Sequence, residues 1–150
     1  MGQLNIQGLD LTVLKQIVDD RGAVYHYLKI GDKNFKRFGE AYYSRVNEGV
    51  IKGWKYHNEI HQEFCVPLGT IEIVVYDDRQ DSESYGCFDK VVLDDLDNYA
   101  RLSMPPKLWY SFKCVSKGYS LLANIIDQPH KQNESKVLPL NTDLIPYIWK

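Results

Sequence analysis

The chain has 150 residues, a length that suits one domain with a sizeable apolar core. Charged residues make up 25% of it and the formal net charge is −2, so no surface dominated by one sign points to nucleic acid or to an anionic membrane as a partner. No apolar run approaches the roughly 18 residues that a membrane-spanning helix needs.

Two features predict a cytoplasmic protein. The first residues, MGQLNIQGLD, lack the basic and then apolar pattern of a secretory signal. The three cysteines, Cys65, Cys87 and Cys114, lie in apolar stretches, and an odd number without metal-like spacing indicates reduced, structural thiols.

Short β-type segments recur along the chain, with turn residues between them. Residues 11–18 form a short apolar segment, either an edge strand or a helical turn, and residues 19–22 (DDRG) follow as a turn. The predicted strands are then 23–30, 38–46, 49–56, 63–66, 70–76, 87–93, 100–104, 108–115 and 119–126. Residues 77–86 are a polar loop, and residues 127–150 are an irregular tail whose apolar end (IPYIW) is expected to pack back on the barrel.

No segment has the periodicity of a long amphipathic helix, and there is no internal repeat or linker. The sequence therefore predicts a single all-β domain over residues 1–150, an antiparallel sandwich or barrel. Eleven tyrosines fit this prediction, because tyrosine favours strands and carries a polar end suited to a wet interior.

Ionisable residues interrupt one of these β-type stretches, Gly49 to Gly69. Lys55 and His57 are two residues apart, so on a strand both side chains point to the same face. A Lys and a His facing the concave side of a small β-fold are better explained by a ligand than by packing. The structural alternative is a Lys that extends to solvent beside a hydrogen-bonded barrel His.

The spacing of Gly49, Lys55, His57, Gln62 and Gly69 resembles the first motif of the cupins. Cupins place His, His and Glu where this chain has Lys, His and Gln, and Tyr110 stands where their second motif has its His. The resemblance implies a jelly-roll barrel. Because only one of the usual ligands remains, we expect no bound metal and no other cofactor.

A narrower resemblance is to the dTDP-4-dehydrorhamnose 3,5-epimerase family, especially its short relatives found with polysaccharide genes. Residues 77–86 (DDRQDSESYG) are similar to that family's D-L-R-x-x-S-P-T-F/Y-G, residues 19–22 to its D-x-R-G turn, and residues 49–53 (GVIKG) to its G-V-L-R-G. The resemblance implies epimerisation of a nucleotide-linked 4-keto-6-deoxy sugar for surface polysaccharide, in a cytoplasmic homodimer.

The chain also departs from that family. Lys55 stands at the position of the catalytic His, Gln62 at that of a Lys that steadies the enolate, and the late-strand Tyr is absent from residues 123–126 (ANII). Residues 52–57 and 105–109 resemble instead the 3,4-ketoisomerases of the same sugars, in which His57 matches a catalytic His. A binding module that has lost the chemistry is a third possibility.

These comparisons give the predicted site. His57 and Lys55 are the candidate bases, Lys55 could also polarise the keto oxygen, and Tyr110 or another lumen tyrosine could return the proton. Substrate-binding residues are predicted to be Arg21, Lys52, Gln62, Arg79 and Asn124. The cations among them suit a diphosphate, although surface pairing with Asp19, Asp20, Asp77 and Asp78 would also explain them. Trp54 and Tyr56 are expected outside the lumen, at a dimer interface or covering the sheet, and His61 in a solvated turn.

Overall fold

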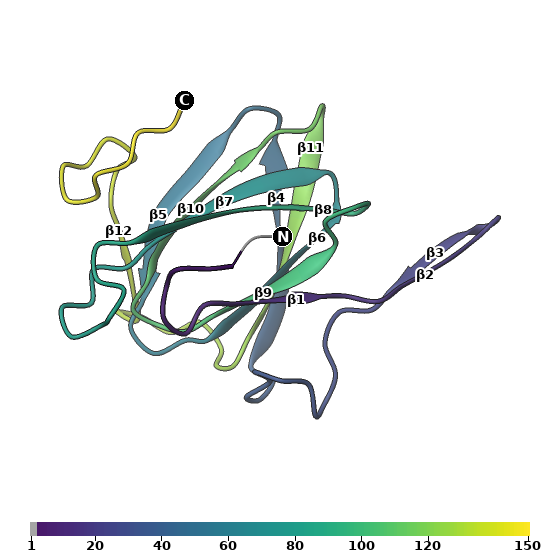
Figure 1. Ribbon diagram of the computed structural model, residues 1–150, viewed down its shortest axis with the longest axis horizontal. Coiled ribbons are helices and arrows are strands. Elements are labelled where there is room, and N and C mark those ends of the chain that lie inside the picture. Colours follow the sequence, from purple (N-terminus) through teal and green to yellow (C-terminus); the bar gives the residue numbers. More distant parts are fainter. Residues whose placement is uncertain (1–2) are drawn as a thin grey trace.

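The computed structural model describes residues 3–150, and within that range it consists of β-strands and connecting loops without a helix (Figure 1). No segment of this range is therefore a helix that could cross a membrane. The strands are β1 (Asp10–Val13), β2 (Gln16–Asp19), β3 (Gly22–Tyr25), β4 (Glu40–Asn47), β5 (Ile51–His57), β6 (Gln62–Leu68), β7 (Thr70–Tyr76), β8 (Phe88–Asp94), β9 (Ala100–Met104), β10 (Trp109–Cys114), β11 (Tyr119–Ile126) and β12 (Ser135–Val137).

Ten of these strands form two antiparallel sheets. The first sheet has the order β1-β9-β6-β11-β4 and the second the order β12-β5-β10-β7-β8, while β2 and β3 form a separate hairpin. Side chains alternate along each strand, so Ile71, Ile73 and Val75 of β7 point inward and meet Phe64 and Leu102 of the first sheet in one core. The predicted all-β antiparallel sandwich is confirmed.

The C-terminal tail covers the outer face of the second sheet. Trp54 is fully buried there with Val74 and Trp109, under Ile145 and Tyr147 of the tail. The prediction that the tail packs back is therefore correct. Trp54 belongs to this intrachain cluster, and Tyr56 packs against it, so both cover the sheet within one chain, which is the second of the two alternatives expected for them.

The outer face of the first sheet holds a buried charged network. Glu63 lies 3.1 Å from the guanidinium of Arg101 and accepts a hydrogen bond from Ser103, and His61 Nε2 lies 2.8 Å from its other oxygen. His61 is only 8% exposed, so the expectation of a solvated turn histidine was wrong. It is buried because the chain turns directly into β6 and pairs it with Glu63.

The hairpin β2–β3 projects away from both sheets (Figure 1). Residues 11–18, expected as one segment, are split between β1 and β2 because Leu14 is buried against Cys65 and Tyr99. That anchor bends the chain, and the hairpin leaves the body beyond it.

Candidate active site

A cavity of about 230 Å³ opens between the two sheets. Its walls come from β4, β6 and β11 of the first sheet and from β5, β10 and β12 of the second. The lining residues are Tyr42, Ser44, Lys52, Gly53, Trp54, Lys55, Phe64, Tyr110, Phe112, Leu122, Asn124 and Val137. Four predicted site residues, Lys52, Lys55, Tyr110 and Asn124, are therefore brought together at one surface.

A bulge between β5 and β10 sets the position of the reactive side chains. Lys55 pairs with Tyr110, but the next pair is Gly53 with Ser111, so Trp54 is the extra residue on β5. Gly53 has a φ of 123°, and a Cβ there would lie 2.7 Å from the Ser111 Cα. Only glycine allows this approach. The bulge directs Lys55 and Tyr110 to the cavity while Trp54 is buried under the tail.

His57 lies at the end of β5, paired with a carboxylate that the sequence did not indicate. Its Nδ1 is 2.5 Å from Glu134 Oε1, and both side chains are almost completely buried. Glu134 Oε2 accepts hydrogen bonds from the backbone N–H groups of Glu59 and Ile60, which fix the carboxylate. The Nδ1–H of neutral His57 therefore donates to Glu134, and its lone pair lies on Nε2.

Burial and hydrogen bonding set the ionisation of this pair. Burial lowers the pKa of His57 below its ordinary value. The Glu134 carboxylate acts to raise this pKa, but the effect of burial is larger. Burial raises the pKa of Glu134, but the hydrogen bonds from Glu59, His57 and Ile60 outweigh it and hold that pKa below its usual range. The pair therefore consists of a neutral imidazole and a carboxylate at neutral pH.

The Tyr110 hydroxyl connects His57 to the cavity. It lies 3.4 Å from His57 Nε2, and it donates to Gln62 Oε1 at 3.2 Å. Gln62 Oε1 also accepts from Asn124 Nδ2, which donates in addition to the Tyr42 hydroxyl. A continuous hydrogen-bonded chain thus runs from Glu134 to Tyr42, between the second sheet and the first.

The cavity is positively charged. Lys52 and Lys55 are its only ionised lining residues, and none of the lining residues is acidic. The Lys52 ammonium donates to the carbonyl of Arg45, while the Lys55 ammonium has no hydrogen bond or ion pair within the part of the chain that the structure describes. A cation without a partner beside a base suits an anionic or strongly polarised ligand.

Four predicted site residues do not line this cavity. His57 and Gln62 contact its wall through Tyr110, whereas Arg21 and Arg79 pair with carboxylates elsewhere. Arg21 lies at the exposed tip of the β2–β3 hairpin and pairs with Asp19 at 2.7 Å. Arg79 pairs with the buried carboxylate of Asp77, which also accepts from Ser82 and Ser84 and so fixes the loop after β7. Their contact with a diphosphate stays a prediction.

Three residues of the site were missed in the sequence. Glu134 and His130 fall in the tail that was predicted to be irregular, and Tyr42 was one tyrosine among eleven. The His130 ring lies 5.0 Å from that of Tyr42 and 6.1 Å from that of His57, measured between centroids, and its Nδ1 is 3.1 Å from Glu40. The one available signal for Tyr42 was its alternation with Ser44 on a predicted strand.

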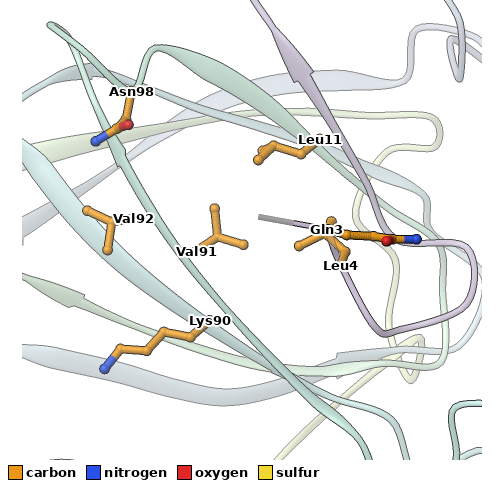
Figure 2. A pocket seen from close by; sticks show the side chains of 7 residues that line it. All are labelled: Gln3, Leu4, Leu11, Lys90, Val91, Val92 and Asn98. Carbon is orange, nitrogen blue, oxygen red and sulfur yellow. The ribbon is translucent and has the colours of Figure 1, made fainter. Parts of the chain in front are cut away.

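A second hollow, of about 260 Å³, lies between the N-terminal segment, β1 and β8 (Figure 2). Its lining mixes apolar residues such as Leu4, Leu11 and Val91 with the polar Gln3 and Asn98. Its one charged residue, Lys90, is paired with Glu72 at 3.1 Å. It contains no convergent acid–base groups. Among residues 3–150, no group of three or more His, Cys, Asp or Glu side chains is arranged to hold a metal ion.

The fold and the cavity together define a cupin-type barrel with acid–base groups in its lumen. A model of the dTDP-4-dehydrorhamnose 3,5-epimerase family matches residues 3–148, and the chain belongs to this family of sugar epimerases. The family resemblance and the enzyme class predicted from the sequence are thereby confirmed.

Several known proteins are similar to this chain. A crystal structure described as a dTDP sugar isomerase from Desulfovibrio desulfuricans is 38% identical, with a TM-score of 0.95, and covers 99% of this chain and 95% of its own. The probable low-salt glycan biosynthesis epimerase Agl13 of Haloferax volcanii is 30% identical over 80% of this chain and 78% of its own. The spore coat polysaccharide biosynthesis protein SpsL of Bacillus subtilis is 25% identical over 96% of both chains.

Proposed function

We propose that the protein epimerises a nucleotide-linked 4-keto-6-deoxy sugar, with dTDP as the first nucleotide to test. The observation that carries this proposal is the line of contacts from Glu134 through His57 to Tyr110. Tyr110 and Lys55 both line the cavity. This arrangement provides a base and a cation at one place, as proton removal beside a ketone requires. The descriptions of similar proteins as a dTDP sugar isomerase and a glycan biosynthesis epimerase support the substrate class.

In this proposal Tyr110 passes the proton to His57. For this step the Tyr110 hydroxyl turns from Gln62 Oε1 to His57 Nε2. The C–H bond beside the ketone breaks, its electron pair enters the enolate, and the proton moves to the Tyr110 oxygen as the Tyr110 hydroxyl proton moves to His57 Nε2. The Glu134 carboxylate stabilises the resulting imidazolium of His57. This is the role of the third group in a catalytic triad, which orients the base. Burial raises the pKa of Tyr110, so a free phenolate is unfavourable and transfer to His57 is required.

The predicted residues in and beside the cavity bind the substrate. Lys55 holds the keto oxygen as it becomes an enolate, and Lys52, at the exposed rim, binds the diphosphate. The Asn124 Oδ1 is buried without a hydrogen-bond partner among residues 3–150, so it can accept from a sugar hydroxyl, with Gln62 fixing the amide. No metal is required in this mechanism, since Lys55 supplies the positive charge.

We further propose a cytoplasmic homodimer that acts in polysaccharide biosynthesis. The cytoplasmic location is supported by three unpaired cysteines, two of them buried, and the pathway by the descriptions of Agl13 and SpsL. The dimer is supported by the hairpin, on which Ile17, Val18 and Val24 are 45%, 70% and 58% exposed. Isolated two-stranded hairpins are marginal in water, so a second copy is its expected support.

Placing charges on the hairpin tests the dimer. Ile17 pairs with Val24, and the double variant Ile17→Asp/Val24→Asp is expected to run as a monomer in size-exclusion chromatography with light scattering. Leu144→Asp, at an exposed position of the tail, is the matched control and should leave the dimer intact. A double variant that stays dimeric at micromolar concentration contradicts this interface.

Deuterium exchange tests the reaction. The protein is incubated in deuterated water with nucleoside-diphosphate 4-keto-6-deoxy sugars, and NMR follows the protons at C3 and C5. We expect deuterium to enter at the carbon whose configuration inverts. A 3-keto product would indicate a ketoisomerase, and tight dTDP binding without exchange on any substrate would indicate a binding module; both results contradict the proposal.

A further inference from the structure

Tyr42 lines the same cavity as Tyr110, from the opposite sheet. It is on β4 and is paired in register with Asn124 of β11. We propose that Tyr42 is the proton donor of this enzyme and protonates the enolate on the face opposite Tyr110 and His57. This inference rests on the proposed function and adds a catalytic residue to it.

The two tyrosines come from different sheets. Tyr110 is in the middle of the second sheet, whereas Tyr42 is on the edge strand of the first, and both line the same cavity. Inversion at carbon requires that the proton leave from one face and return to the other. Groups on facing walls meet that requirement, whereas His57 and Tyr110, both from the second sheet, contact one another and act from one side.

The hydrogen bonds favour Tyr42 over Tyr110 as the donor. The Tyr110 hydroxyl donates to Gln62 Oε1 and faces His57 Nε2, so its proton is already bound within the chain of polar groups. The Tyr42 oxygen, in contrast, accepts from Asn124 Nδ2 at 3.0 Å. Its own O–H is therefore left to donate to a ligand. Asn124 also aligns the phenol, because the same amide nitrogen is held by Gln62.

Tyr42 also carries its proton when the reaction starts. Burial raises the pKa of Tyr42 and outweighs the hydrogen bond from Asn124, which acts to lower it. The phenol is therefore protonated at neutral pH. The hydrogen bond from Asn124 stabilises the phenolate that forms on donation. Tyr42 is only partly buried, next to the half-exposed His130, and it regains a proton from solvent after each turnover.

The step is balanced by these groups alone. The enolate carbon takes the Tyr42 proton and forms the new C–H bond, the ketone is restored at C4, and the phenolate takes a proton from water. The imidazolium of His57 returns its proton through Tyr110 to solvent. No oxidant, reductant or second substrate takes part.

Tyr42→Phe separates proton removal from proton return. With the keto sugar in deuterated water, this variant is expected to lose at least about 100-fold in formation of the epimer. It should still exchange the substrate proton for deuterium with retained configuration, because His57 and Tyr110 remain. Tyr43→Phe, which changes the adjacent and 70% exposed tyrosine, is the matched control and should match the wild type. Tyr110→Phe is expected to lose exchange and epimerisation together.

Each outcome decides the assignment. Epimerisation at the wild-type rate in Tyr42→Phe, or loss of exchange together with epimerisation in a variant that melts like the wild type, overturns it. Exchange with retention in Tyr110→Phe would show that Tyr110 is the donor and would also overturn it. A wild-type protein that exchanges no proton contradicts the proposed function itself, a result distinct from failure of the Tyr42 assignment alone.

Discussion

His57→Asn is expected to abolish both solvent exchange and epimerisation, by about 10³-fold or more, because the variant has no base for the substrate proton. The asparagine can still donate to Glu134, so the buried carboxylate keeps a partner and the fold is retained. Exchange of the sugar protons followed by NMR measures the first step directly. Exchange at the wild-type rate in this variant would remove His57 from the mechanism.

The pH dependence of the rate identifies the same group. Neutral His57 is the active form, and its pKa lies below the ordinary value, so activity is expected to be full at neutral pH and to be lost as pH falls through that lowered pKa. Glu134→Gln removes the carboxylate that raises the pKa of His57. The acidic limb should therefore shift to still lower pH, while the maximal rate falls by about 10⁴-fold because the imidazolium loses its partner.

Glu59→Gln is the matched control for that substitution. Glu59 is exposed and pairs with Lys131 at 2.7 Å, and the change leaves its backbone N–H bond to Glu134 in place. The variant should keep the wild-type rate and pH profile. An acidic limb that does not move in Glu134→Gln would show that another group titrates in the reaction.

The strands were predictable because one face of each sheet meets the core. Residues 70–76, 100–104 and 119–126 were predicted with the bounds that the structure has, since each is a short segment with apolar residues that is flanked by turn residues. Residues 23–30 were predicted as one strand, but β3 ends at Tyr25. Beyond it the chain packs on the first sheet through Tyr27, whose hydroxyl donates to the Glu63 carbonyl, a contact that local pattern does not encode.

Some residues of the candidate site could be predicted from their spacing in the sequence, and others could not. Lys55 and His57 share a short strand, so their spacing was informative. Glu134 reaches His57 only because β12 pairs with β5, and 77 residues separate the two side chains. Tyr42 likewise gains its significance from pairing with Asn124. Long-range strand register decides both contacts, and a single sequence contains no direct record of it.

Lys55→Met is expected to lower kcat/KM by about 10²–10³-fold, the usual loss when a group that stabilises a developing oxyanion is removed. Lys55 is paired with Tyr110 across β5 and β10, and its ammonium is available to a ligand beside the proton-transfer groups. Because the charge on the keto oxygen grows toward the transition state, the loss should appear in kcat.

Lys52→Met gives the comparison that separates chemistry from binding. Lys52 is exposed at the cavity rim, with its ammonium on the Arg45 carbonyl, so it is placed to hold the diphosphate and not the ketone. Its loss should raise KM with little change in kcat, since a contact equal in ground and transition states affects binding alone. If Lys55→Met also raised KM without lowering kcat, Lys55 would be a second phosphate contact, and the enolate would have to be stabilised by another group.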